Sequence, residues 1–273
     1  MEGQDEETFE QYCLAKIKQA EASSYLKELD LLDSQGNIKK DAVQEAWKSW
    51  RGENKSKLWA EIGIAALRGV PYEYLGNMEK AMQYYWLGTY YYLHPTPMHA
   101  TAKPPLHIDE RFAYAEPQLT AAICNDRIGN RGRARQLFEW AAAHLTVTED
   151  EKDQFRREGY PNMVWEYTTD RAFCLLCLER WEEALSAAEE AERWVKMDTG
   201  RYEKFGRQYT PFHLLPVYLA LARFKAHPSP EREKEARKRF MLSEYKVRVN
   251  HLRHGALLYI FELWSRNAEL LRQ

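Results

Sequence analysis

The sequence has little glycine or proline, few cysteines, almost no net charge and no long apolar run. It contains 13 glycines and 11 prolines in 273 residues, too few for the many turns of an all-β sandwich. No apolar run approaches the ~20 residues that a membrane span needs, and residues 1–10 are acidic, unlike a secretory signal. The 39 Lys+Arg and 41 Asp+Glu nearly cancel, so the overall charge gives no reason to expect binding to DNA or to a membrane.

Four cysteines are present, and because no signal segment opens the chain we expect free, mostly packed thiols in a cytoplasmic protein. Cys174 and Cys177 have the spacing of a zinc or redox pair. A structural zinc needs four ligands, and no second pair of ligand spacing lies nearby. We therefore expect both thiols to pack on a helix face, and Cys13 and Cys124 stand alone.

The sequence has no recognised catalytic or cofactor motif. It lacks a glycine-rich phosphate loop, a nucleophile elbow and a supported pair of carboxylates. His94, His99 and His107, with Asp109 and Glu110, lie in or near a proline-rich segment, but their spacing matches no known ligand set. We predict no metal, no cofactor and a protein that is not an enzyme, although scattered catalytic residues would leave no such motif.

Apolar residues recur with the 3.6-residue helical period along most of the chain, which predicts an all-α fold. Gly69 and Pro71 are expected to end a third helix, and Pro117 either kinks a later helix or begins it. The expected helices cover residues 6–29, 41–50, 57–68, 111–127, 149–157, 212–226, 231–248 and 251–271, with turn-to-helix segments at 75–93 and 128–141, and two helices within 165–195 that meet near 178–181.

A turn followed by an alanine-bearing helix recurs at a nearly constant interval. The alanines Ala81, Ala134, Ala184 and Ala236 are 53, 50 and 52 residues apart. A Gly-Asn pair precedes the first two, and in most copies an aromatic or small residue follows four positions later and another small residue seven positions later. This period predicts successive helical hairpins that bury one another's apolar faces.

The pattern resembles the tetratricopeptide repeat (TPR), a helical hairpin with a glycine near its turn and small and aromatic residues at fixed places. The copy at Ala81 matches in its second helix only, because Pro71 is expected to interrupt the first, and the copy at Ala236 is weak. The resemblance covers residues 57–245, with a longer period than the family's ~34 residues. The best matches are Gly129, Ala134, Phe138 and Ala141, and then Trp181, Ala184 and Ala191 with Ala172 in the first helix.

The resemblance implies a right-handed superhelical array of antiparallel hairpins, a TPR-like α-solenoid with a concave face. The expected divisions are an N-terminal helical cap at 1–56, repeats at 57–250 and a C-terminal capping helix at 251–273. In this family the first helix of each hairpin lines the concave face, which holds a peptide. By resemblance, the partner-binding residues are Glu116, Leu119, Ile123, Asp126, Arg127, Glu166, Thr169, Phe173, Leu176, Tyr218 and Leu221.

This mixture of apolar and a few charged residues suits an amphipathic segment of a partner protein. Co-chaperone members of the family hold a C-terminal carboxylate with lysines and asparagines. The corresponding positions here are Ala66, Val70, Leu119 and Ile123, so that role is not expected. The leading hypothesis is a non-enzymatic scaffold that binds a protein or peptide. The alternatives are a sensor or regulator with a small ligand or signal peptide in the groove, and an enzyme with an unrecognised site.

Three further segments bear on partners. The aromatic run at 84–92 predicts either mixed packing or a recognition surface. The basic segment at 223–254 places Glu231, Glu233 and Glu235 among its bases at helical pair spacing, which predicts a solvated face and not a nucleic-acid site. The last helix, 251–271, either caps the array or meets a second copy of the chain in a homodimer.

Overall fold

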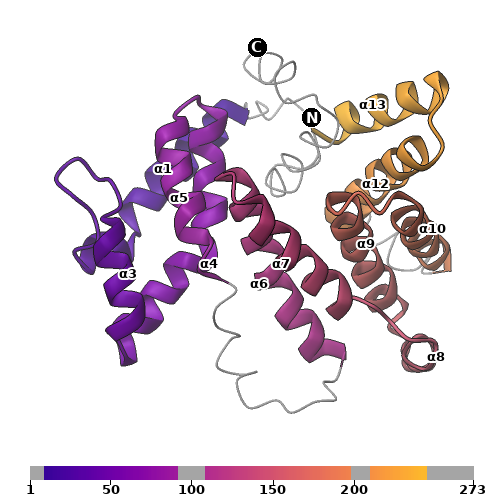
Figure 1. Ribbon diagram of the computed structural model, residues 1–273, viewed down its shortest axis with the longest axis horizontal. Coiled ribbons are helices and arrows are strands. Elements are labelled where there is room, and N and C mark those ends of the chain that lie inside the picture. The colour runs from indigo at the N-terminus through magenta and orange to yellow at the C-terminus, as the bar shows by residue number, and fades with distance from the viewer. Residues whose placement is uncertain (1–8, 92–107, 198–209, 245–273) are drawn as a thin grey trace, which may run out of the picture. The chain divides into compact units, whose positions relative to one another are not determined.

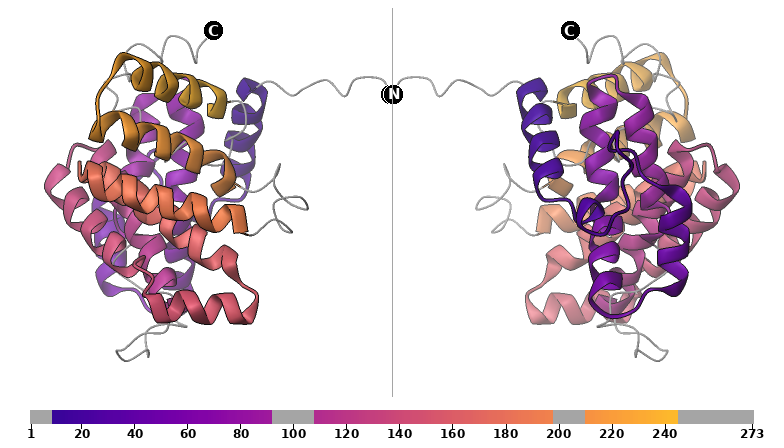
Figure 2. Two further views of the ribbon diagram at one scale, coloured as in Figure 1. Left: turned by 90° about the vertical axis from the view of Figure 1, so that its right-hand side faces the viewer. Right: turned by 90° about the vertical axis from the view of Figure 1, so that its left-hand side faces the viewer.

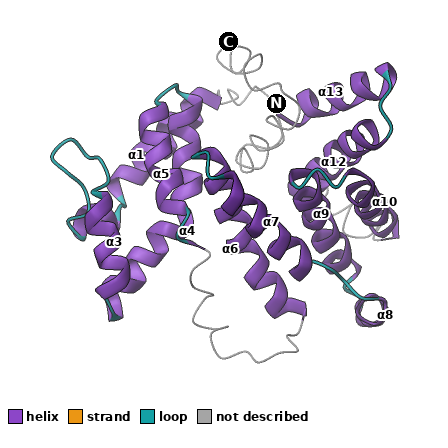
Figure 3. Ribbon diagram, viewed as in Figure 1, coloured by secondary structure: helices purple, strands orange, loops and turns teal. Residues whose placement is uncertain are grey.

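The computed structural model describes residues 9–91, 108–197 and 210–244, and this part of the chain is all-α (Figures 1 and 3). Its one β feature is an isolated antiparallel bridge between Leu32 and Ile38. The first helices are α1 (Phe9–Ala22), α2 (Tyr25–Glu28), α3 (Lys40–Ser49), α4 (Gly52–Tyr74) and α5 (Met78–Gly88). They are followed by α6 (Ile108–Arg127), α7 (Arg131–His144), α8 (Glu149–Glu158), α9 (Pro161–Cys177), α10 (Trp181–Met197), α12 (Thr210–Ala226) and α13 (Pro230–Glu244).

The described residues fall into two compact units. Unit 1 comprises 9–91 and 120–134, and unit 2 comprises 108–119, 135–197 and 210–244. The boundary runs through α6 and α7, whereas the divisions expected from the sequence lie at residues 56 and 250. The expected division into a cap, repeats and a capping helix concerns the role of each segment and stays a prediction. Its last part, 251–273, lies outside the described residues.

Within unit 1, α4 is the central helix. It packs against α5 along its length and also contacts α1, α2 and α3. In unit 2, α9 packs on α10, α10 on α12 and α12 on α13, so that successive helices lie side by side (Figure 2). In unit 2 the helices from α9 onward thus pack mainly against their neighbours in the sequence, whereas in unit 1 α1 and α2 pack on α4.

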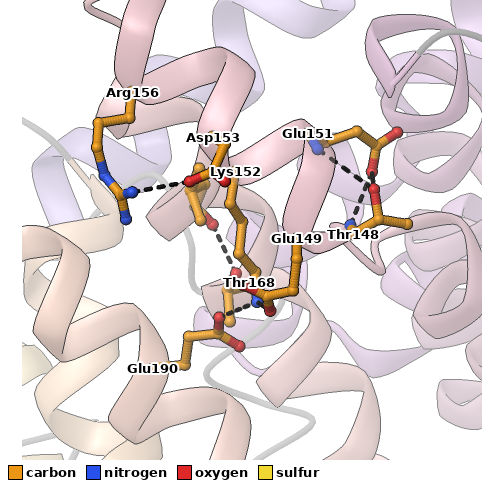
Figure 4. A network of polar contacts seen from close by, with 9 residues as sticks. Thr148, Glu149, Glu151, Lys152, Asp153, Arg156, Thr168 and Glu190 are labelled. Atoms are coloured by element: carbon orange, nitrogen blue, oxygen red, sulfur yellow. Dashed lines mark hydrogen bonds and ion pairs between the residues drawn. The ribbon is translucent and has the colours of Figure 1, made fainter.

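The short helix α8 begins and ends at residues that can be recognised in the sequence. Thr148 and Glu151 form a reciprocal capping box, and Gly159 ends the helix in the left-handed conformation at φ 76°. Lys152 forms ion pairs with Glu149 and with Glu190 of α10, which fastens α8 to unit 2 (Figure 4).

The expectation that α4 stops before Pro71 is wrong. The helix begins earlier than expected, at Gly52, and continues through Pro71 to Tyr74. A proline inside a helix costs about 3 kcal/mol, but Pro71 lies in the last turn, where its own carbonyl still accepts a bond from the Leu75 N–H at 3.1 Å. The buried side chains of Val70 and Tyr72 on either side offset the cost. α6 and α12 likewise continue through Pro117 and Pro216.

The turns after α4, α6 and α9 share one geometry, which also ends α2 at Asp30 and α8 at Gly159. After α4, α6 and α9, the second residue beyond the helix is left-handed: Gly76 at φ 78°, Gly129 at φ 83° and Glu179 at φ 60°. In each turn, the next residue's N–H donates to a carbonyl five positions back, at 2.8, 2.8 and 3.0 Å, which is the Schellman motif. The turns after α4, α6 and α9 are therefore equivalent, although only two of them contain glycine.

Small buried residues occupy matching positions around these turns. Because Gly69 has no side chain, the ring of Tyr85 can approach so closely that an added Cβ would lie 2.7 Å from it. An added Cβ at Gly88 would lie 2.6 Å from the Cys124 sulfur. The first helix of this copy, which Pro71 was expected to interrupt, therefore carries a small residue at the matching position. The three matching sets are Gly69, Ala122 and Ala172; Ala81, Ala134 and Ala184; and Gly88, Ala141 and Ala191, all of them buried.

Candidate functional site

The residues predicted to bind a partner differ widely in exposure. Glu116 is exposed, and Asp126, Arg127 and Glu166 are partly exposed. The others are inaccessible to a partner in this structure, and their predicted role would need a change of conformation to expose them. The buried members are Leu119, Ile123, Thr169, Phe173, Leu176, Tyr218 and Leu221, each at most 3% exposed.

Phe173 shows how the buried members are used within unit 2. Its ring centre lies 6.1 Å from that of Phe138 on α7 and 5.5 Å from that of Tyr218 on α12. The Thr169 hydroxyl, one turn earlier, donates to the Trp165 carbonyl at 2.6 Å. The first-helix face of α9 therefore contributes to the core of unit 2.

Arg127 takes part in a buried charged cluster in unit 1. Its Nη2 lies 2.8 and 3.0 Å from the two carboxylate oxygens of Glu73 on α4, and the Tyr85 hydroxyl on α5 donates to the same carboxylate. The guanidinium carbon is 5.7 Å from the centre of the Tyr85 ring, within cation–π range. One carboxylate thus joins α4, α5 and α6.

Burial controls the electrostatics of this cluster. It raises the pKa of Glu73 above the ordinary 4.5, against the opposing effects of Arg127 and the Tyr85 hydroxyl. Burial, together with the adjacent Glu73, also raises the pKa of Tyr85 well above its usual range. These groups are oriented toward one another, so the cluster favours a structural role, holding three helices in register, over proton transfer to a ligand.

A second buried ion pair lies within α4. Arg68 Nη1 is 2.8 Å from Glu61 Oε2, and the side chains are 7% and 1% exposed. Glu61 also accepts the Tyr25 backbone N–H at 2.8 Å, which ties α2 to α4. The sequence analysis missed Glu61, Arg68 and Glu73. A signal was present, because acid and base stand seven residues apart on an otherwise apolar helix face.

An open pocket of about 640 Å³ lies within unit 1. Its rim is formed by the end of α1, the turn before α2, the loop before α3 and the first turn of α5, and Tyr72 and Tyr84 line it from α4 and α5. The size is within the range typical of small-molecule sites. The lining residues are Glu21, Ser24, Lys27, Asp30, Leu32, Asp33, Ser34, Gln35, Gly36, Asn37, Tyr72, Asn77, Glu79, Lys80 and Tyr84.

Hydrogen bonds hold the loop at the pocket rim. Asp33 Oδ1 accepts the backbone N–H groups of Gln35 at 2.9 Å and Asn37 at 2.8 Å. From α5, the Gln83 amide nitrogen donates to Asn37 Oδ1 at 3.0 Å, and Lys80 donates to the Gly36 carbonyl. The pocket wall is therefore preformed.

The other sequence candidates give no second site. Cys174 is buried and Cys177 half-buried, and none of the four cysteines forms a disulfide. Within residues 9–91, 108–197 and 210–244, no group of three or more His, Cys, Asp or Glu side chains is arranged to hold a metal ion. The proline-rich segment with His94, His99 and His107 lies outside these ranges, as does the last helix.

The aromatic run at 84–92 has mixed packing where it is described. Tyr84 and Tyr85 are buried, and Tyr90 is half-buried with its ring 5.8 Å from Trp47 and 5.3 Å from Trp86. In the basic segment, the described part of α13 pairs its charges along one helix, as expected: Arg237 lies 2.6 Å from Glu233, and Arg239 lies 2.6 Å from Glu235. No helix in the described residues is long and apolar enough to cross a membrane.

Comparison with known proteins places the chain in no family. It matches no family model, no curated protein sequence and no solved structure. Its function must be argued from its own residues.

Proposed function

We propose that the chain is a non-enzymatic scaffold that binds a protein or peptide through a TPR-like, right-handed array of hairpins. The observation that carries this proposal is the recurrence of one turn geometry after α4, α6 and α9. Gly76, Gly129 and Glu179 are 53 and 50 residues apart, and each precedes a buried alanine by five positions. Helical arrays built from such units commonly present extended binding surfaces.

The exposed members of the predicted first-helix set are the candidates for partner contact. Glu116 is exposed on α6, and Glu166 is partly exposed on α9, where it accepts a bond from the Asn162 amide at 3.2 Å. Acidic side chains at these positions favour a partner segment that carries basic residues beside its apolar ones. A cytoplasmic location is part of the proposal, supported by four cysteines of which none forms a disulfide.

The test uses charge reversal on two helices of unit 2. The full chain, its Glu116→Arg variant and its Glu139→Arg variant are used to recover partners from the native extract. Glu139 is an exposed residue of α7 that pairs with exposed Arg135 at 3.4 Å, so its reversal is a matched control. The proposal expects Glu116→Arg to lose the recovered partner and Glu139→Arg to retain it. Equal recovery by both variants would reject the first-helix surface.

The unit 1 pocket favours a second candidate function, a sensor for a small ligand. Its preformed wall and its volume of about 640 Å³ are the specific observations in favour. A ligand that binds only the folded chain raises the unfolding midpoint by mass action, so a thermal-shift screen of metabolites tests this alternative. Turnover of any substrate in a generic panel would instead support the third alternative, an enzyme.

A further inference from the structure

The helix α8 is attached to the rest of unit 2 by little apolar surface. All of its ten residues except Gln154 and Phe155 are charged, and Phe155 is the one that is buried. The ring centre of Phe155 lies 6.4 Å from that of Tyr167 on α9, which is the apolar part of the contact. The neighbouring helix α9, in contrast, buries most of its seventeen residues. One aromatic ring therefore supplies most of the apolar attachment of α8.

Charged side chains also link α8 to α6 and α10. Lys152 pairs with Glu190 of α10 (Figure 4), and the Arg156 guanidinium carbon lies 5.0 Å from the centre of the Trp194 ring. Arg111 of α6 pairs with a carboxylate in the first turn of α8. Dissolved salt screens ion pairs near the surface, whereas it does not weaken the burial of apolar side chains in this way. The attachment of α8 should therefore depend on ionic strength.

The chain on both sides of α8 is anchored independently of the helix. Before it, Leu145 and Val147 are 2% and 9% exposed, and after it Val164 of α9 is fully buried. Gly159 ends α8 in the left-handed region at φ 76°, and an added Cβ there would meet no atom within 4 Å. An isolated helix of this length is not stable in water. When α8 detaches it therefore also unwinds, while the anchors on both sides stay in place.

We propose that α8 is a salt-sensitive latch that opens as a local unit while α9 and α10 stay folded. In the closed form it covers the rings of Tyr167 and Trp194, which are 1% and 5% exposed. Opening uncovers part of both rings and replaces a charged surface of unit 2 with an aromatic one. A local opening that loses few buried apolar contacts requires less free energy than global unfolding. This inference concerns a motion within unit 2 and does not depend on the proposed scaffold function.

The test is hydrogen exchange of the full chain, followed by mass spectrometry at about 0.05 M and about 0.5 M salt, between which the screening of exposed charges increases strongly. We expect the amides of α8 to exchange faster than those of α9 and α10. Their exchange relative to α9 should be faster still at the higher salt concentration. Oxidative labelling of Trp194 should increase over the same range of salt, because part of its ring is then uncovered.

Three variants separate the contributions to the latch. Glu190→Gln removes the α10 partner of Lys152 and should speed the exchange of α8 about two- to fivefold at low salt. Phe155→Ala should speed it about a hundredfold or more, because the buried ring is lost. Glu192→Gln makes the same chemical change on α10 at a carboxylate that lies 3.1 Å from Lys196 of the same helix. This control should leave the exchange of α8 unchanged.

Four outcomes would overturn the latch. They are exchange of α8 no faster than that of α9, exchange of α8 that salt does not change, and an equal effect of Glu192→Gln and Glu190→Gln. The fourth is a Phe155→Ala chain that exchanges as fast in α9 and α10 as in α8, because the helix would then open only together with the whole unit.

Discussion

At the scale of single residues, buried charged side chains strongly affect the free energy of unfolding of unit 1. Glu73 and Arg127 have side chains only 5% and 9% exposed, and they come from helices separated by more than 30 residues. A buried ion pair contributes little relative to apolar packing, but the loss of one partner is expensive because the other charge is left in an apolar environment. The cluster therefore acts as a constraint on how α4, α5 and α6 meet.

Replacing Arg127 tests this constraint. We expect Arg127→Met to lower the free energy of unfolding by about 3–5 kcal/mol, because the Glu73 carboxylate would stay buried without its cation. The double variant Glu73→Gln/Arg127→Met should recover part of this loss. Urea denaturation gives the values, with Arg135→Met, at an exposed side chain, as the control that should change stability by less than about 1 kcal/mol.

The raised pKa of Glu73 predicts a pH dependence. Because the folded-state pKa is above the ordinary 4.5, folding takes up a proton at this group. Its contribution to stability is therefore fully present below about pH 4.5 and is lost as the pH rises through the folded-state pKa. The unfolding free energy of the natural chain, relative to that of Glu73→Gln, should therefore decrease as the pH rises from 4, as urea denaturation at a series of pH values would show. A difference independent of pH would contradict this direction.

The turn after α9 predicts opposite effects of glycine at equivalent positions. Glu179 has φ 60°, and an L-residue in this region costs about 1–2 kcal/mol. Glu179→Gly should raise the free energy of unfolding, measured by chemical denaturation, by up to about 1 kcal/mol after the entropic cost of glycine is subtracted. Gly129→Ala should lower the free energy of unfolding by about 1 kcal/mol. Backbone strain is the only cause expected, because an added Cβ there meets no atom within 4 Å.

At the scale of elements, helices approach one another where small residues lie. Ala184 is fully buried on α10, five positions after the turn, as Ala81 and Ala134 are on their helices. The helix α8 shows a different means of attachment: the Arg156 guanidinium lies 5.0 Å from the Trp194 ring, and Lys152 pairs with Glu190. Close packing and peripheral charges thus fix different helices.

Overpacking one crossing tests the first of these mechanisms. Ala184→Leu should lower the free energy of unfolding by about 1–3 kcal/mol, because the added carbons have no space between α10 and its neighbours. Ala143→Leu makes the same chemical change at an exposed position of α7 and should have an effect below about 0.5 kcal/mol. Chemical denaturation compares the two variants, and equal midpoints would mean that the Ala184 face is not a packed crossing.

At the scale of the whole molecule, the charges nearly balance. The formal net charge is −2 and the sequence pI is about 6.5, so self-repulsion is weakest slightly below neutral pH. We expect solubility to be lowest near pH 6.5 and to rise on either side. Light scattering against pH at constant ionic strength measures this, and a minimum more than about one pH unit away would show that local patches such as the acidic pocket dominate association.

Much of the helical content could be predicted from the sequence. The period of apolar residues, the capping box at Thr148 and the Ser229 cap of α13, whose hydroxyl accepts the Arg232 N–H at 3.2 Å, are local signals. The error at Pro71 arose because a local rule was applied where burial of the last turn outweighs it. The partner-binding set came from a family resemblance and included seven buried side chains, because resemblance transfers positions without their exposure.

Most of the helices, the places of their turns and the 53- and 50-residue spacing of equivalent positions can be recognised in the sequence alone, because these depend on residues within a few turns of one another. Three features depend on the folded chain: Glu73 meets Arg127 across 54 positions, Glu179 adopts a conformation usual for glycine, and four carboxylates from separate segments line one pocket. These features depend on which distant groups become neighbours when apolar surface is buried, and local propensity carries no information on such pairings.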